Sequence, residues 1–197
     1  MVSRGLRRLA AALTVLAAVV VPSEATRAAA PAGRKVVLVG LDAADWQAID
    51  PLVARGELPT FARLKSAGRT GLLLSTPPLL SPIVWTTIAT GRTPDDHGVL
   101  DFMADLPGGG QRPVGSRERR VPALWNLFSS AGDTVAVVGW WATAPAEDVR
   151  GTIVSDRVAP QLTRAAAGLS PGSVSPAHQA SRVAPDLVSI SQVGLEE

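Results

Sequence analysis

The sequence predicts an α/β fold, with a mostly parallel sheet flanked by helices. Short unbroken apolar runs recur along the chain, and segments with apolar residues at helical spacing separate them. Apolar runs without polar alternation are typical of strands buried on both faces, and strands that alternate with helices indicate layered α/β architecture. The 197 residues, 46% of them hydrophobic, suffice for one domain with a sizeable core.

The first thirty residues have the pattern of an export signal. Residues 1–8 contain three arginines, residues 9–21 are apolar, and residues 22–30 are small or polar. This order of regions is typical of a secretory signal peptide. The apolar run of about 13 residues is shorter than the roughly 20 that a membrane-spanning helix needs. We therefore expect a signal peptide over residues 1–30, export to the periplasm or the medium, and no stable membrane span after cleavage. An uncleaved anchor is the alternative.

The exported part begins with two predicted strands around a helix. Residues 34–41 read RKVVLVGL, an apolar run with three valines, and Asp42 follows it directly. Residues 45–68 carry apolar side chains at helical spacing and close on Gly68, a favourable residue for a helix C-terminus. Residues 70–75 form the second strand candidate, and a proline-rich loop follows them.

The next segments continue the alternation of helix and strand. Pro82 suits the first turn of a helix over residues 83–90, and residues 107–120 show no periodicity. A helix over residues 121–131 then precedes strands at residues 134–138 and 151–155, after which the pattern fades. We expect the α/β domain to occupy residues 31–159, and residues 160–197 to be an irregular tail or the start of an insertion.

Charge and cysteine content narrow the function classes. The chain has 19 basic and 17 acidic residues, but the basic excess lies in the first thirty residues. The rest carries one more acidic than basic side chain, whereas a nucleic-acid-binding domain is usually strongly basic. We therefore expect no nucleic-acid binding. The absence of Cys excludes a disulfide scaffold and a Cys-rich zinc module.

Asp42 and Ser81 are the candidate chemical residues, and each has two interpretations. Asp42 follows the first predicted strand, where the ligand crevice of an open α/β sheet lies, so its carboxylate could bind a metal or simply stabilise a turn or cap a helix. Ser81 precedes Pro82 and the predicted helix. Its hydroxyl could be an activated nucleophile at the positive helix end or a plain helix cap.

The remaining polar and aromatic candidates have structural interpretations. His97 lies between Pro94 and Gly98 in a turn, and His178 stands in a Ser/Pro/Ala-rich segment without close acidic neighbours. We expect a structural role for His97 and a surface position for His178. Trp140 and Trp141 follow a predicted strand, a place where tryptophan usually packs at the rim or in the core.

Three blocks in order resemble a known family. VVLVGLDAADW, LPTFARLKSAG and STPPLLSPIVWTTIATGRTPDDHGVLDF are similar to the N-terminal part of the alkaline phosphatase superfamily, in its type I phosphodiesterase/nucleotide pyrophosphatase branch. The similarity is strong over residues 34–103 and looser to residue 157. It implies an alkaline-phosphatase-like core, which would be incomplete in this chain.

The resemblance also implies a mechanism. In that superfamily the aspartate that ends the first strand binds a catalytic metal, a position that matches Asp42. The nucleophilic Thr or Ser precedes a helix that ends in Thr-Gly, which matches Ser81. The family mechanism is in-line attack on a phosphoryl group of a small-molecule phosphate ester, through a covalent phospho-enzyme, usually with two Zn²⁺ ions.

The sequence departs from the family pattern at several points. Nucleotide pyrophosphatases usually read Thr-Phe-Pro-Asn-His at the nucleophile, and Val84 stands where that Asn would be. The arginine expected in sulfatases is absent as well. Of the metal-site side chains of the family, only Asp42 and Ser81 are present. The chain has two histidines, and neither lies in the setting of the later Asp-x-x-x-His and Asp-His pairs of the family.

These departures leave two hypotheses. The first is the N-terminal portion of an exported metal-dependent phosphoesterase that acts on phosphodiesters or phosphomonoesters and is inactive as this chain alone. The second is a non-catalytic exported α/β binding module. One carboxylate and one hydroxyl cannot hold two zinc ions, because zinc sites normally need three or four protein ligands each.

Overall fold

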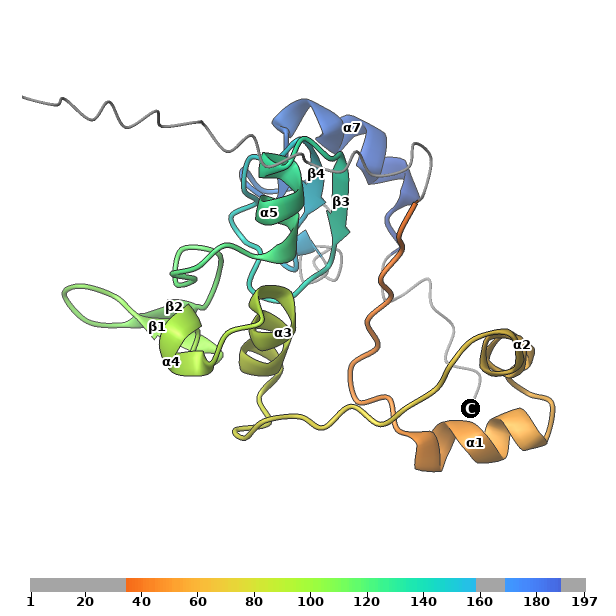
Figure 1. Ribbon diagram of the computed structural model, residues 1–197. Helices are drawn as coiled ribbons and strands as arrows, with labels where there is room; N and C mark the ends of the chain where they lie inside the picture. Colours follow the sequence, from red (N-terminus) through yellow and green to blue (C-terminus); the bar gives the residue numbers. More distant parts are fainter. Residues whose placement is uncertain (1–34, 159–168, 189–197) are drawn as a thin grey trace, which may run out of the picture. The chain divides into compact units, whose positions relative to one another are not determined.

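A computed structural model describes residues 35–158 and 169–188 of the chain (Figure 1). The chain divides into two compact units, residues 1–41 and residues 42–197. The predicted signal peptide over residues 1–30 lies outside the described residues, as do residues 159–168 and 189–197 of the predicted tail. Within the described ranges, no helix has the length and apolar character needed to cross a bilayer.

Two predicted strands are not formed. Residues 35–41, the described part of the first unit, and residues 70–75 of the second unit have neither helix nor strand geometry. Their apolar side chains are exposed, with Val36 at 92% and Leu74 at 88% of full exposure. The strand prediction is therefore wrong at both places. An apolar run indicates only a tendency toward burial, whereas a strand also needs a neighbour that completes its hydrogen bonds.

The predicted helix over residues 45–68 forms as two helices, α1 (Trp46–Ala54) and α2 (Pro59–Ala67). Asp45 caps α1, since its side chain accepts a hydrogen bond of 2.9 Å from the backbone N–H of Gln47. The break lies between them because Gly56 has a φ of 77°, outside the helical region, and Pro59 begins the next helix. Neither helix contains a buried residue.

Helix α3 (Ser81–Thr90) confirms the helix predicted there and begins two residues earlier than expected. Leu80 is its N-cap, Pro82 lies in its first turn, and Gly91 ends it with a φ of 63°. Its buried residues are Pro82, Ile83, Thr86 and Ala89. A single turn, α4 (Pro94–His97), follows and ends at Gly98.

The described strands form two small sheets and correct the expectation of a mostly parallel one. In the first, β1 (Met103–Asp105) pairs antiparallel with β2 (Gln111–Pro113), and β2 lies within residues 107–120, for which no regular structure was predicted. In the second, β3 (Val135–Val138) is parallel to β4 (Gly151–Val154), and β4 is antiparallel to β5 (Val174–Ser175). The α/β class is confirmed, but only one of the three strand pairs is parallel.

The main core joins α3 to the three-stranded sheet. Helix α5 (Leu124–Ser130) precedes β3, as the sequence predicts, and these elements lie side by side in Figure 1. The core cluster consists of Ala89, Ala123, Trp125, Val137 and Ile153. Because Ala89 comes from α3 and Val137 from β3, this cluster fixes the helix that begins at Ser81 to the sheet.

The described residues 169–188 belong to the segment expected to be an irregular tail. They form β5 and three short helical turns: η1 (Ala177–Gln179), α7 (Ala180–Val183) and η2 (Ala184–Asp186). Val174 of β5 is buried in a small cluster with Val154 and Val158. This segment therefore adds the third strand to the sheet and part of its packing.

Candidate functional site

Ser81 and Asp42 lie together, although 39 residues separate them in the sequence. Ser81 is the first residue of α3, and its Oγ donates a hydrogen bond of 2.9 Å to Oδ2 of Asp42. The N-cap position belongs to Leu80, whose side chain makes no capping bond. The Ser81 hydroxyl is therefore engaged with a carboxylate rather than with the helix backbone.

The turn around Asp42 holds the carboxylate in place. Its second oxygen, Oδ1, accepts a hydrogen bond of 3.1 Å from the backbone N–H of Ala43. Ala43 has a φ of 55°, a left-handed conformation that is uncommon for a residue with a side chain. Asp45, three residues further on, is the residue that caps α1. Asp42 thus has a turn contact and a contact with Ser81, and it remains exposed.

The start of α3 provides a positive electrostatic environment for the Ser81 oxygen. The aligned peptide dipoles of a helix place partial positive charge at its N-terminus, which favours an anion there. Pro82 has no N–H, and the N–H groups of Ile83 and Val84 both donate to the carbonyl of Leu80, so these groups act on the Ser81 oxygen through the helix dipole rather than as free donors. The combination of a helix N-terminus and a neighbouring carboxylate suits a hydroxyl that attacks an electrophile.

The donor set around Asp42 does not fit a pair of zinc ions. Across residues 35–158 and 169–188, no group of three or more His, Asp or Glu side chains is arranged to hold a metal. Asp42 and Ser81 offer one carboxylate and one hydroxyl, whereas a catalytic zinc ion normally takes three protein ligands. The structure therefore brings together the two predicted residues without completing a metal centre around them.

His97 is fully buried, and both of its ring nitrogens have partners. Nδ1 accepts a hydrogen bond of 3.1 Å from the backbone N–H of Val99, so Nε2 carries the proton toward Thr87 Oγ1 at 3.0 Å. Burial lowers the pKa of His97, and the nearby Asp96 carboxylate opposes this shift. These contacts fit the structural role predicted for His97. His178 is exposed in η1, as expected for a surface residue.

The tryptophans after β3 connect the sheet to α3. The indole N–H of Trp140 donates to the carbonyl of Trp85 at 3.1 Å, and the two rings meet edge to face with centroids 5.0 Å apart. Trp85 is one helical turn beyond Ser81. Trp140 therefore helps to fix the first half of α3, which agrees with the packing role expected for it.

Asp156, two residues after β4, is a polar residue that the sequence pattern does not single out. Its carboxylate accepts hydrogen bonds from the backbone N–H groups of Ala142, Thr143 and Ala144, at 3.1 to 3.2 Å. The hydroxyl of Thr143 adds a further contact at 3.3 Å. The signal available in the sequence was its position, an aspartate that ends an apolar run just as Asp42 does.

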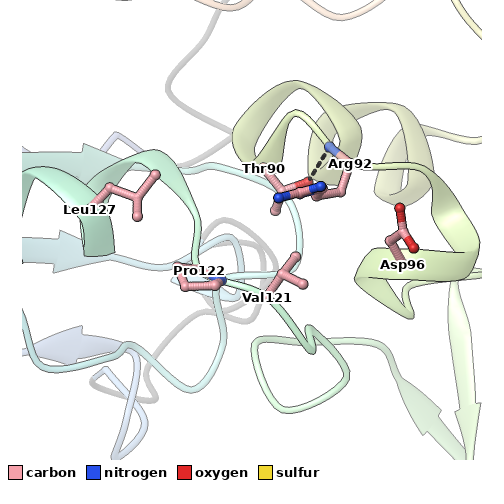
Figure 2. A pocket seen from close by; sticks show the side chains of 6 residues that line it. All are labelled: Thr90, Arg92, Asp96, Val121, Pro122 and Leu127. Carbon is pink, nitrogen blue, oxygen red and sulfur yellow. Dashed lines mark hydrogen bonds between the residues drawn. The ribbon is translucent and has the colours of Figure 1, made fainter.

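A hollow of about 320 Å³ lies at the other end of α3 (Figure 2). It is lined by Thr90, Arg92, Asp96, Val121, Pro122 and Leu127. Within it, the Thr90 hydroxyl oxygen accepts from the backbone N–H of Arg92 and donates to the carbonyl of Thr86. The lining does not include Asp42 or Ser81, and its one hydroxyl is already bonded. The candidate site is therefore the Asp42–Ser81 pair.

The comparisons with known proteins agree with the resemblance seen in the sequence. A family model described as type I phosphodiesterase / nucleotide pyrophosphatase matches residues 36–187. This range contains Asp42, Ser81 and all the described strands. The family supports a phosphoesterase-like function and is generally metal-dependent. No curated protein and no solved structure gives a significant match.

Proposed function

Because the chain belongs to the type I phosphodiesterase / nucleotide pyrophosphatase family, we propose that its chemistry is the hydrolysis of small-molecule phosphate esters, with Ser81 as nucleophile. The observation that carries this proposal is the 2.9 Å hydrogen bond from Ser81 Oγ to Asp42 at the start of α3. Family membership supports the class of reaction, and this contact supports Ser81 Oγ as the attacking atom.

The proposed step is attack of Ser81 Oγ on the phosphorus of the ester. The bond between phosphorus and the leaving alkoxide breaks as the Oγ–phosphorus bond forms. The Ser81 proton passes to the carboxylate of Asp42 and from there to the departing oxygen, which leaves as the alcohol. Water then attacks the phosphoserine, which releases phosphate or a phosphate monoester and restores the hydroxyl. The positive end of α3 favours the negative charge that develops at Oγ.

We propose zinc as the metal of the complete site, with Asp42 as one of its ligands. Zinc would supply Lewis-acid stabilisation of the phosphoryl oxygens. Since Asp42 and Ser81 are too few donors for two ions, no step is assigned to the metal. We expect this chain to be inactive alone and to be the N-terminal portion of the hydrolase unit, exported through the signal peptide over residues 1–30.

A non-catalytic exported binding module is the second candidate function. The observation that favours it is the missing metal donor set in the described residues. In that case the Asp42–Ser81 contact would stabilise the turn before α1, and Ser81 would have no unusual reactivity.

The test combines metal content with the reactivity of Ser81. The exported chain is purified, its zinc content is measured, and it is incubated with bis(4-nitrophenyl) phosphate beside Ser81→Ala. Ser66→Ala is the matched control, since Ser66 is an exposed helical serine whose hydroxyl bonds a local carbonyl. We expect no turnover, but a slow phosphoryl adduct on Ser81 that mass spectrometry detects in the parent and in Ser66→Ala.

Each outcome decides between the candidate functions. An adduct that disappears only in Ser81→Ala supports the nucleophile. Bound zinc with Ser81-dependent turnover supports the hydrolase and overturns the expectation of inactivity. Absence of both zinc and adduct in every variant favours the binding module.

A further inference from the structure

An apolar groove lies along α3, on the stripe of the helix surface that includes Ser81. Ser81, Val84 and Ile88 occupy positions i, i+3 and i+7 of the helix, which places them on one stripe of its surface. Val84 and Ile88 line a hollow of about 130 Å³ together with Thr87 and residues 73–76. Because each residue rises about 1.5 Å along a helix, Val84 lies about 4.5 Å further along the axis than Ser81.

The groove is built for an uncharged, apolar group. Leu73, Leu74, Val84 and Ile88 provide carbon surface, and none of the lining residues is charged. Of its hydroxyls, that of Thr87 already has a contact with the ring of His97. Ser75 and Thr76 also line the groove, but no charged side chain does, so a second phosphate there would lose water without gaining a charged partner, which costs free energy.

The two leucines at the groove give an apolar ligand a favourable contact. Leu73 and Leu74 are 83% and 88% exposed. An apolar group that enters beside them removes carbon surface from water on both partners, which favours binding by about 25 cal/mol for each Å² buried. The volume of about 130 Å³ is near the roughly 150 Å³ of an enclosed engineered cavity that binds benzene, whereas this groove is open to solvent beside the two leucines.

We propose that this groove binds an aryl or short alkyl group of the phosphate ester whose phosphorus Ser81 attacks, and that Val84 determines this preference. The inference rests on the proposed function, because it places the phosphorus at Ser81. The substrate class is then a phosphate ester of an apolar alcohol with about six carbons. A nucleotide places charged and hydroxyl groups near the phosphorus, where this chain has valine and leucine.

The test measures binding rather than turnover. Ligand-observed NMR titrations of the exported chain use 4-fluorophenyl phosphate, methyl phosphate and 4-fluorophenol. The variant Val84→Thr keeps the side-chain shape but places a hydroxyl in the groove. Val138→Thr is the matched control, because Val138 is an exposed valine on β3 that does not line the groove. Circular dichroism checks that both variants fold.

We expect 4-fluorophenyl phosphate to bind at least about tenfold more tightly than methyl phosphate, since a buried ring removes several CH groups from water. Val84→Thr should weaken the aryl ester about fivefold and leave methyl phosphate unchanged, whereas Val138→Thr should change neither.

The outcomes separate this inference from the proposed function. If the aryl and methyl esters bind equally well and the Ser81 adduct forms, the groove is not an aryl subsite, but the proposal that Ser81 is the nucleophile remains supported. Binding of 4-fluorophenol without binding of either ester also overturns the groove as an ester subsite. An aryl preference that Val84→Thr reduces about fivefold supports the groove even where no Ser81 adduct forms. An aryl preference unaffected by Val84→Thr contradicts the role of Val84.

Discussion

Asp42 and Asp156 both end an apolar run, but the fold uses them differently. Asp156, which follows β4, accepts hydrogen bonds from three consecutive backbone N–H groups and one hydroxyl of residues 142–144, in the loop between β3 and β4. Asp42 accepts one local N–H and the hydroxyl of Ser81, and it is exposed. A carboxylate oxygen has about two acceptor sites. Asp156 has therefore used its acceptor capacity on the fold, whereas Asp42 retains capacity for a ligand.

The left-handed alanines beside the two aspartates sharpen the contrast. Ala142, near Asp156, has a φ of 57°, and Ala43, near Asp42, has a φ of 55°. A left-handed backbone conformation at a residue other than glycine costs free energy, which the surroundings must offset. The Asp156 carboxylate stabilises the turn at Ala142 directly, because it accepts a hydrogen bond from the Ala142 N–H. The Asp42 carboxylate likewise accepts a hydrogen bond from the Ala43 N–H, at 3.1 Å, but it makes fewer further contacts than Asp156 and is exposed.

The largest expected effect is that of Asp156→Ala on stability. The change leaves the N–H groups of Ala142, Thr143 and Ala144 without their acceptor, and we expect the free energy of unfolding to fall by about 3 kcal/mol. Urea denaturation measures it. Asp156→Asn, which keeps one acceptor oxygen, should cost less than Asp156→Ala. If Asp156→Ala lowers the free energy of unfolding no more than Asp42→Ala does, the difference between the two aspartates is contradicted.

Glu147 extends the comparison to a third carboxylate. It accepts hydrogen bonds from Arg119, Trp125 and Asn126, and the Arg119 side chain is only 4% exposed. We expect Glu147→Gln to lower the free energy of unfolding by about 2 kcal/mol, because it leaves a nearly buried guanidinium without its counter-charge. Thermal and urea unfolding would measure this loss.

Glu57→Gln is the matched control for Glu147→Gln. Glu57 pairs with Arg55 on the surface, where both side chains are more than half exposed. An exposed ion pair contributes little, so Glu57→Gln should change stability by less than about 0.5 kcal/mol. Equal losses in the two variants would show that Glu147 is as weakly coupled to the fold as Glu57.

His97 should make the stability of the protein depend on pH. Burial lowers the pKa of His97 in the folded protein below its ordinary value of 6.5, and Asp96 only partly opposes this. The unfolded chain therefore binds the proton more readily, so stability is full above about pH 6.5 and falls as the pH decreases toward the folded pKa. Urea unfolding from about pH 7 to about pH 5 should show this decrease.

Two histidine variants isolate that decrease. His178→Gln, on the exposed histidine, should keep the pH dependence of the parent chain, and His97→Gln should flatten it. The same slope in His97→Gln as in His178→Gln would mean that carboxylates, rather than His97, produce the loss of stability in acid.

The smallest expected effect on stability is that of Asp42→Asn. Its contacts are exposed, so we expect the free energy of unfolding to stay within about 0.5 kcal/mol of the parent value. In the same variant the phosphoryl adduct on Ser81 should form at least about tenfold more slowly, because the acceptor of its proton is gone. A large loss of stability with an unchanged adduct rate would reverse the roles given to Asp42 and Asp156.

The sequence predicted the fold best where local signals and packing agree. Helix α3 was recognisable from Pro82 in its first turn, and β3 and β4 from apolar runs of which the core buries Val137, Ile153 and Val154. Residues 35–41 and 70–75 have equally apolar runs but no strand partner in the described structure. Composition carries the tendency to be buried, whereas the pairing of strands depends on contacts that are distant in the sequence.

The candidate site was predicted in its members but not in its surroundings. The order of the sequence blocks pointed to Asp42 and Ser81, and the structure places their side chains within hydrogen-bond distance. The nest of N–H groups around Asp156 could not be predicted, because its donors are backbone groups that every sequence possesses. The groove beside Val84 also depends on where residues 73–76 run, which periodicity does not determine.

The cluster of Trp85, Trp125 and Trp140 should give this protein a distinct near-ultraviolet circular dichroism signal. Trp140 meets Trp85 and Trp125 edge to face, with ring centroids 5.0 and 6.0 Å apart. Indoles at such distances couple electronically, so the cluster should dominate the near-ultraviolet circular dichroism. Because Trp85 lies in the helix that begins at Ser81, loosening of that helix would change the spectrum before the backbone signal of the sheet is lost.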